Sequence, residues 1–220
     1  MANAQTLVIA NKRYSSWSLR PWLAMTHFGV PFDEIVIPLD QEATSQAIRE
    51  HSPAGKVPVL HHGDITVWES LAILDYLADA FYDRPWWPTD PHAKAHARTI
   101  AAEMHAGFGA LREDLTMDVL TVYDPRTWGD NVAKDITRIQ DIWRETRARF
   151  GAGGDFLFGA FTIADAMYAP VVTRFKTYAV EMDDTCSAYV EAVLALPAMQ
   201  KWITEAAEEP WVIEKYARPV

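Results

Sequence analysis

The sequence predicts an α/β domain with the element order βαβαββα, followed by an all-α domain. In the first 82 residues, short apolar runs rich in β-branched side chains alternate with segments of helical apolar spacing. From Ala93 onward the spacing is helical and predicts no strand. Residues 84–91 (RPWWPTDP) contain three prolines and predict no regular element. We therefore assign residues 1–84 to the first domain, 85–91 to a linker and 92–220 to the helical domain.

Seven elements are expected in the first domain. Strands are expected at residues 6–10, 34–39, 57–61 and 65–68, and helices at 18–28, 43–50 and 69–82. Gly29 ends the first helix, and Pro21 falls in its first turn, where the missing N–H costs nothing. Pro38 ends the second strand, and residues 62–64 (HGD) are a hairpin signal. Two βα units predict a parallel pair of strands, and the hairpin adds antiparallel strands.

Helices are expected throughout the second domain. They are predicted at residues 91–123, 126–150, 162–178, 184–194 and 197–207. The first of them is long, and Gly107 and Gly109 predict a bend within it. Residues 151–154 (GAGG) predict a loop between the second and third helices.

Composition and charge limit the classes of function. The 220-residue chain is half hydrophobic and 23% charged, which is typical of a soluble globular protein. Its net charge of −10 argues against binding to nucleic acid or to an anionic membrane. The single cysteine, Cys186, permits no internal disulfide and no cysteine-based metal cluster, so no metal is expected. The sequence has no leader pattern and no run approaching the ~20 apolar residues of a membrane span, so we expect a cytoplasmic protein.

A hydroxyl-rich motif, residues 14–21 (YSSWSLRP), joins the first strand to the first helix. A helix N-terminus presents unpaired N–H groups and a positive dipole end, and nearby hydroxyls can donate to an anion. A thiol pKa of about 8.5 falls by one or two units in such a setting, which corresponds to roughly 1.4–2.7 kcal/mol. One charge-assisted hydrogen bond contributes about 1.5–3 kcal/mol, so one hydroxyl is sufficient. The alternative is that Ser16 or Ser18 only caps the helix.

A second motif, residues 52–60 (SPAGKVPVL), leads into the third strand. A proline at the start of an otherwise central strand is unusual. If the Val57-Pro58 bond is cis, the backbone N–H and C=O of Val57 face outward and can pair with an extended peptide. Lys56 is then placed to pair with a carboxylate. The alternative is an ordinary turn that enters a strand.

A third motif, Glu69-Ser70, opens the third helix, where the helix amides are free. A ligand carboxylate can dock on the hydroxyl and N–H of Ser70, while Glu69 pairs with a ligand ammonium. The alternative is that the two side chains only cap the helix.

In their order and spacing, these motifs resemble the glutathione-binding half of the cytosolic glutathione S-transferase superfamily, whose N-terminal domain is thioredoxin-like. The family elements are a serine, tyrosine or cysteine after the first strand, a cis-proline after valine, and a Glu/Gln-Ser pair opening the third helix. The corresponding residues in this chain are Ser15, Val57-Pro58 and Glu69-Ser70. Residues 159–165 (GAFTIAD) resemble the family's capping box, which has a structural role, with Thr162 as the N-cap and Asp165 as its reciprocal acid.

The pattern Ser-Ser-x-Ser-x-Arg is similar to the serine classes of this superfamily, particularly zeta-like bacterial proteins. In them the catalytic serine lies five residues before the arginine, which here selects Ser15 over Ser16. Ser16 is then a second donor or a helix cap, and Tyr14 is a neighbouring hydroxyl that competes with Ser15. Trp17 stands where the zeta class commonly has cysteine, so the zeta isomerase activity is not carried over directly.

The resemblance implies that glutathione is a co-substrate and that Ser15 is the catalytic hydroxyl. The residues that it implies in glutathione binding are Ser16, Trp17, Lys56, Val57, Glu69 and Ser70. The electrophile is expected between the domains, opposite the thiolate. The candidate residues there are Met104, His105, Phe108 and Arg112, which share a face of the long helix by their spacing, and Arg174 of a later helix. Alternatively, His105 packs at a domain or dimer contact, and the two arginines pair with acids.

The leading hypothesis is a glutathione transferase that conjugates glutathione to a small hydrophobic electrophile. The resemblance also implies a homodimer. One alternative uses the same thiolate for cis–trans isomerisation, as in maleylacetoacetate isomerase, or for peroxide reduction. Another is a non-catalytic glutathione-binding scaffold, because one fold hosts members with different functions.

Overall fold

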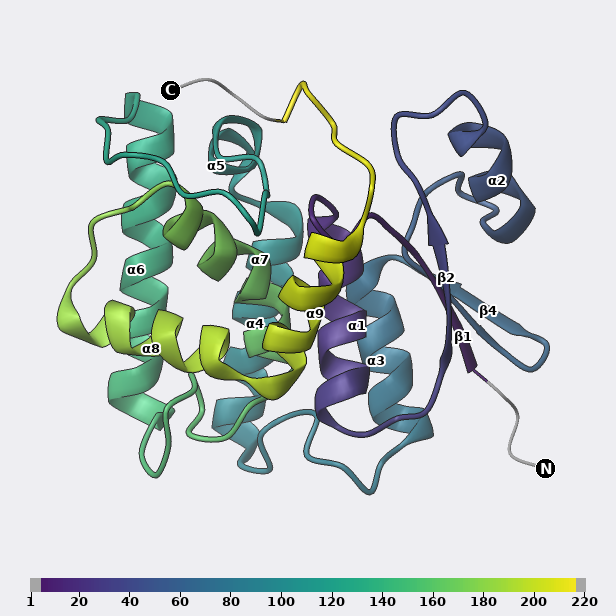
Figure 1. Cartoon of the computed structure of the whole chain (residues 1–220). Helices are drawn as coiled ribbons and strands as arrows, with labels where there is room; N and C mark the ends of the chain where they lie inside the picture. Colours follow the sequence, from purple (N-terminus) through teal and green to yellow (C-terminus); the bar gives the residue numbers. More distant parts are fainter. Residues whose placement is uncertain (1–4, 217–220) are drawn as a thin grey trace.

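The computed structural model describes residues 5–216 and confirms an α/β domain followed by a helical domain (Figure 1). The first domain contains β1 (Gln5–Ala10), α1 (Ser16–His27), β2 (Asp33–Ile37), α2 (Thr44–His51), β3 (Val59–His62), β4 (Ile65–Trp68) and α3 (Ser70–Ala80). Its sheet has the strand order β2-β1-β3-β4. The β1-β2 pair is parallel and the other two pairs are antiparallel, as the sequence predicts.

Helices cover both faces of this sheet. α1 and α3 lie on the face toward the helical domain, and α2 lies on the opposite face (Figure 1). Because successive strand residues point to opposite faces, Leu7 and Ile9 of β1 enter the main core. Val8, between them, joins a smaller cluster with Ile48 of α2. Burial on both faces explains why β1 is a continuous apolar run.

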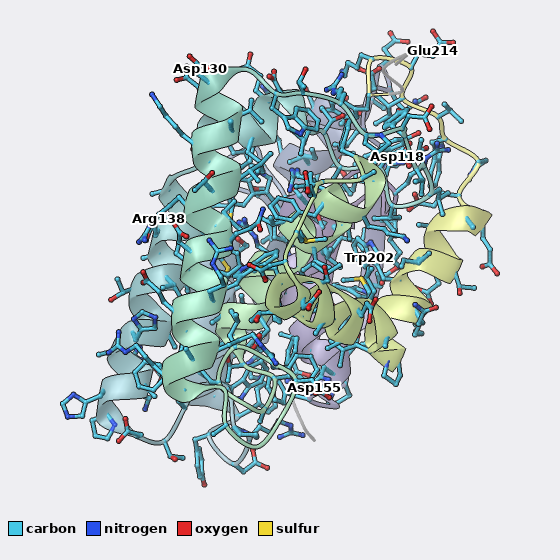
Figure 2. The ribbon with its side chains drawn as sticks, turned by 90° about the vertical axis from the view of Figure 1, so that its left-hand side faces the viewer. Asp118, Asp130, Arg138, Asp155, Trp202 and Glu214 are labelled. Atoms are coloured by element: carbon cyan, nitrogen blue, oxygen red, sulfur yellow. The ribbon has the colours of Figure 1, made fainter. Side chains whose placement is uncertain are left out.

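The helical domain is built around one buried helix. Its helices are α4 (Pro91–Ala106), α5 (Gly109–Asp114), α6 (Asp130–Phe150), α7 (Ile163–Thr177), α8 (Asp184–Ala195) and α9 (Pro197–Glu208). α7 is apolar on almost all sides and nearly all of its residues are buried, because it packs against α1 as well as α4 and α8. α9 also contacts α1: the ring centroids of Trp202 (Figure 2) and Trp22 are 5.0 Å apart. These contacts fix α1 between the two domains.

The prediction of one long helix at residues 91–123 is wrong. α4 ends at Ala106, Gly107 has an extended backbone (φ −98°, ψ −167°), and Phe108 is left-handed (φ 58°). Only the short helix α5 follows, and residues 115–129 form no helix. Tertiary bonds hold this segment: Arg13 binds the Asp118 carboxylate, and the N–H of Tyr123 donates to the carbonyl of Thr177. α6 accordingly begins at residue 130 and not at residue 126.

The prediction that Pro21 lies in the first turn of its helix is also wrong. α1 begins at Ser16, two residues earlier than predicted, so Pro21 lies in the second turn. Its missing N–H leaves the carbonyl of Trp17 without an intrahelical donor. The helix tolerates this because it is held by burial of the residues from Leu19 to Met25.

Several local signals are confirmed. The Val57-Pro58 bond is cis, and Gly63 has a positive φ (63°) in the β3-β4 hairpin. Gly29 (φ 66°) follows α1, and the N–H of Val30 closes the helix end on the carbonyl of Met25. At the start of α7, the expected capping box forms between Thr162 and Asp165. No helix within residues 5–216 is long and apolar enough to cross a membrane.

Candidate active site

Ser15 is the N-cap residue of α1 and closes the loop that follows β1. The carbonyl of Asn11 accepts the N–H of Ser15 at 2.9 Å, which turns the chain into the helix. The Ser15 hydroxyl does not cap the helix; it donates to the hydroxyl oxygen of Ser18 at 2.8 Å. Ser18 in turn accepts the N–H of Ala10, at the end of β1, at 3.1 Å. The sequence-based alternative that Ser16 or Ser18 caps the helix is therefore not what the structure shows.

The N-terminus of α1 offers free donors beside Ser15. Within residues 5–216, the backbone N–H groups of Trp17 and Ser18 donate to no protein acceptor. Ser15 is 8% exposed, and both it and Ser16 line a pocket. A hydroxyl, two amides and the positive end of the helix dipole therefore meet at one place, which is suited to an anion.

The hydroxyl of Tyr14 is already engaged. It accepts the N–H of Ile213 at 3.3 Å, and the Tyr14 side chain is buried. Burial raises the pKa of Tyr14 above its ordinary value. Ser15, which faces Ser18 and the pocket, is the better candidate for the hydroxyl donor.

The three motifs of the first domain line one pocket of about 550 Å³. Its lining residues are Trp17, Lys56, Val57, Pro58, Trp68, Glu69 and Ser70. Within the described chain, the backbone N–H and C=O of Val57 form no hydrogen bond, so both are available to an extended ligand. Lys56 is exposed, and its only hydrogen bond there is from its backbone N–H to the hydroxyl of Ser52.

Glu69 and Ser70 sit at the N-terminus of α3. Glu69 has a positive φ (69°), an uncommon conformation for a residue with a side chain, and such conformations cluster at functional sites. Its carboxylate does not cap α3; an oxygen lies 3.6 Å from Nε2 of His105. The hydroxyl of Ser70 is buried and accepts from the guanidinium of Arg20 at 3.4 Å.

A second pocket, of about 720 Å³, adjoins the first at Trp17. Its lining residues are Tyr14, Ser15, Ser16, Trp17, Leu39, Arg112, Thr116, Met117, Arg174 and Tyr216. Trp17 therefore lines both pockets. Ser15 lines the second pocket, two residues before the shared Trp17.

Two arginines of the second pocket form no ion pair within the described residues, although the charge of Asp135 acts on Arg112. Arg174 is buried and donates to the carbonyls of Leu115 (2.7 Å) and Pro170 (3.3 Å), and Arg112 donates to the carbonyl of His105 (3.2 Å). Within residues 5–216 neither forms an ion pair, contrary to the alternative considered from the sequence. Burial, followed by the charge of Arg112, lowers the pKa of Arg174 to about 10. Burial also lowers the pKa of Arg112.

Arg20 is a site residue that the sequence reasoning missed. It is fully buried behind Trp17, with its guanidinium 4.3 Å from that ring's centroid, and it also donates to the carbonyl of Met167. Burial, followed by the charges of Arg174 and Arg112, lowers the pKa of Arg20 to about 9. The available signal was an arginine within the otherwise apolar run at residues 19–25 (LRPWLAM).

The remaining electrophile-site candidates are not brought together. Met104 is fully buried and Phe108 nearly so; both belong to the hydrophobic core and line neither pocket. The prediction that these residues share one helix face is wrong, because α4 ends before Phe108. His105 is near Glu69 and contacts the edge of the Trp17 ring (centroids 5.4 Å apart). Burial, followed by the charge of Arg20, lowers the pKa of His105 against the opposing effect of Glu69.

Comparison with known proteins gives two family profiles that match this chain. The glutathione S-transferase N-terminal domain profile matches residues 14–80, and the glutathione S-transferase C-terminal domain profile matches residues 126–205. The first range contains the three motifs that line the first pocket, and the second contains Arg174.

Similar proteins cover most of the chain. It is 26% identical over 205 residues to a probable maleylacetoacetate isomerase of Caenorhabditis elegans, spanning 90% of this chain and 92% of that protein. It is 25% identical to glutathione S-transferase Z2 of Arabidopsis thaliana, over 88% of this chain and 91% of that protein. A glutathione transferase homologue from Burkholderia gl BGR1, solved with bound glutathione, has the same fold: the TM-score is 0.70 at 20% identity, over 93% of this chain and 98% of the other.

Proposed function

Because the chain belongs to the glutathione S-transferase family, we propose that it transfers glutathione to an electrophile held in the pocket beside Ser15. The family profiles and the similarity to zeta-class relatives support a glutathione-dependent enzyme. The single observation that carries the transfer reaction is geometric: Ser15 is at the N-terminus of α1, and Trp17, two residues later, lines both pockets.

Glutathione binds in the pocket of Val57 and Ser70. Its γ-glutamyl carboxylate docks on the Ser70 hydroxyl and the N-terminus of α3, and its ammonium pairs with Glu69. The cysteinyl backbone pairs with the free N–H and C=O of Val57, and Lys56 pairs with the remaining carboxylate. The buried charge of Arg20, in contact with Ser70, adds to the attraction of the γ-glutamyl carboxylate.

The thiolate is stabilised by a short hydroxyl relay. A hydroxyl has one proton to donate, so Ser15 must turn its proton from Ser18 to the sulfur. Ser18 then accepts the N–H of Ala10, as it does now, and donates its own proton to the oxygen of Ser15. The free amides of Trp17 and Ser18 add the field of the helix terminus.

The reaction needs little more from the protein. The thiolate sulfur attacks an electrophilic carbon, the new S–C bond forms, and a leaving group such as chloride departs with the electron pair of its bond. The thiol proton has already gone to solvent. Lowering a thiol pKa from about 8.5 to about 6.5 raises the thiolate fraction at neutral pH from about 3% to about three quarters. Orientation of the two reactants supplies the rest.

The test is the pH dependence of conjugation of a chlorinated nitroarene by the wild type, Ser15→Ala and Ser16→Ala. We expect the half-maximal rate of Ser15→Ala to move about one to two pH units upward, toward the pKa of a free thiol. Ser16→Ala should keep the wild-type profile. An unchanged profile in Ser15→Ala, or a shift in Ser16→Ala alone, overturns the assignment of Ser15.

A second candidate function is glutathione-dependent cis–trans isomerisation of an acidic substrate. The observation that favours it is the pair Arg112 and Arg174, which line the second pocket and form no ion pair in the described chain, and a relative is named a probable maleylacetoacetate isomerase. Here the thiolate adds to a double bond, the bond rotates, and the thiolate leaves again. Isomerisation of a cis-unsaturated diacid in the presence of catalytic glutathione, without net consumption of the thiol, distinguishes this activity from transfer.

A further inference from the structure

The segment after α9, residues 209–216, runs back across the molecule to the second pocket. In Figure 2 Glu214, on this segment, lies at the same end of the molecule as Asp118. The segment is anchored at its start: the carboxylate of Glu209 accepts the backbone N–H of Lys12 at 2.6 Å and that of Arg13 at 3.2 Å. Because these N–H groups belong to the loop that leads to Ser15, the start of the segment is tied to the proposed catalytic loop.

The end of the segment is attached at the pocket itself. The N–H of Ile213 donates to the hydroxyl of Tyr14, and the Ile213 side chain is buried. The ring of Tyr216 packs on that of Tyr14, with 5.8 Å between the centroids, and its carbonyl accepts from the hydroxyl of Thr116. On the outer side, Lys215 pairs with Asp40. Contacts from several elements therefore hold Tyr216 in place.

Tyr216 lines the pocket that is also lined by Ser15, Arg112 and Arg174. Tyr14, Trp17 and Tyr216 give this pocket three aromatic walls. Tyr216 is half-buried, and Nζ of Lys215 lies over its ring at 5.6 Å from the centroid, whereas the Tyr14 hydroxyl is used internally. An aromatic side chain that is fixed by packing and lines the pocket of the proposed reacting group is suited to contact an aromatic substituent.

We propose that Tyr216 is a specificity-determining residue that selects electrophiles with an aromatic ring, because the segment 209–216 holds its side chain as a wall of the second pocket. This inference rests on the proposed function, since it takes the second pocket as the electrophile site. Tyr14 acts through Tyr216 as a positioning residue: its hydroxyl holds Ile213 and its ring supports the ring of Tyr216.

The experiment measures binding and so needs no turnover. Affinities of glutathione, S-methylglutathione and S-(4-nitrobenzyl)glutathione are measured by calorimetry on the full chain. In Tyr216→Ala, we expect the nitrobenzyl conjugate to bind about fivefold more weakly, within the two- to tenfold range of an aromatic contact, while the other two ligands change less than about twofold. Tyr216→Phe, which keeps the ring, should bind the conjugate as the wild type does.

Two further variants separate this role from a general structural one. Val212→Ala changes a side chain of the same segment that is 61% exposed, and it should leave all three affinities unchanged. Tyr14→Phe should weaken only the nitrobenzyl conjugate, because it releases the N–H of Ile213. Equal weakening of all three ligands in Tyr216→Ala, or an unchanged or tighter affinity for the conjugate, overturns the inference. Failure of the wild type to bind any of the three ligands overturns the proposed function itself.

Discussion

Arg13 and Asp118 form a two-pronged ion pair that joins the loop before Ser15 to the helical domain. Nε and Nη2 of Arg13 donate to the two carboxylate oxygens of Asp118, each at 2.8 Å. The Asp118 side chain is 1% exposed and that of Arg13 is 21% exposed. In the same loop, the backbone N–H groups of Tyr14 and Ser15 both donate to the carbonyl of Asn11. The position of the proposed catalytic hydroxyl therefore depends on a contact between residues 105 positions apart.

Asp118→Asn should destabilise the protein by about 2–3 kcal/mol. Removing one partner of a buried pair costs about 3–5 kcal/mol, and the partial exposure of Arg13 reduces that cost. The measurement is urea unfolding. Asp75→Asn is a matched control, because Asp75 and Arg98 form a pair in which both side chains are 55% exposed, and it should change stability by less than about 0.5 kcal/mol.

The pH dependence of the Asp118 contribution has a definite sign. Burial acts to raise the pKa of Asp118, but hydrogen bonds from Arg13 and Thr121 outweigh it and leave the pKa below its ordinary value of 3.8. The stabilisation is therefore present at neutral pH and is lost as the pH falls below about 4. The difference in unfolding free energy between the wild type and Asp118→Asn should shrink in that acidic range. A difference that stays constant contradicts the role of the charged pair.

Ser18→Ala should act on both stability and the thiolate. The N–H of Ala10 loses its acceptor in a fully buried position, which costs about 1–3 kcal/mol of unfolding free energy. The hydroxyl relay loses its second member, so the pKa of bound glutathione should rise, but by less than in Ser15→Ala. Unfolding curves and a thiol titration measure the two effects. An increase in the thiol pKa as large as that in Ser15→Ala would mean that Ser18 itself donates to the sulfur.

Binding of S-methylglutathione should weaken as the pH falls below 6.5, the ordinary pKa of a histidine. Burial and the charges of Arg20 and Arg112 hold the pKa of His105 below its ordinary value of 6.5, so His105 is neutral near pH 7. When it becomes protonated it pairs with the nearby Glu69, which then competes less well for the ligand ammonium. Calorimetry at several pH values measures this effect, and His105→Asn should remove it. A ligand without a thiol is used so that no thiol ionisation contributes.

Cys186 should be unreactive in the folded protein. Burial, followed by the charge of Asp183, raises the pKa of this thiol to about 12, and it is the single cysteine of the chain. Its side chain contacts the carbonyl of Gln140 and lines neither of the two pockets. We expect a thiol-specific reagent to label the unfolded chain and not the native one, and Cys186→Ala to keep its activity. Rapid labelling of the native protein contradicts the structure.

Most of the fold could be predicted from local patterns in the sequence. The β1 strand, the hairpin around Gly63 and the Thr162–Asp165 capping box each depend on residues close together in the chain, so their chemistry is readable directly. The first pocket was also predictable, because each motif that lines it lies at the end of one element. The choice of Ser15 over Ser16 came from the family resemblance. The structure adds two features to the predicted site: the free amides at the start of α1 and the hydroxyl of Ser18.

The wrong predictions, and the site residues that were not predicted, concern parts of the chain held by long-range contacts. Residues 115–129 have an apolar content that suits a helix, but the bonds of Asp118 to Arg13 and of Tyr123 to Thr177 hold them in another conformation. No short-range signal reports such partners. Met104 shows the same limit, since helical spacing placed it on a shared face while packing buried it in the core. Tyr216 was missed because its place in the second pocket depends on the path of the segment after α9.

The most direct test of the account is the pKa of the glutathione thiol bound to the protein, titrated by the ultraviolet absorbance of the thiolate in the wild type and in Ser15→Ala. We predict a bound pKa about one to two units below the free value of about 8.5 in the wild type, and a return to within about half a unit of the free value in Ser15→Ala. Affinity for S-methylglutathione should be the same in both proteins. A bound thiol pKa that is equally low in Ser15→Ala contradicts the claim that the Ser15 hydroxyl holds the thiolate.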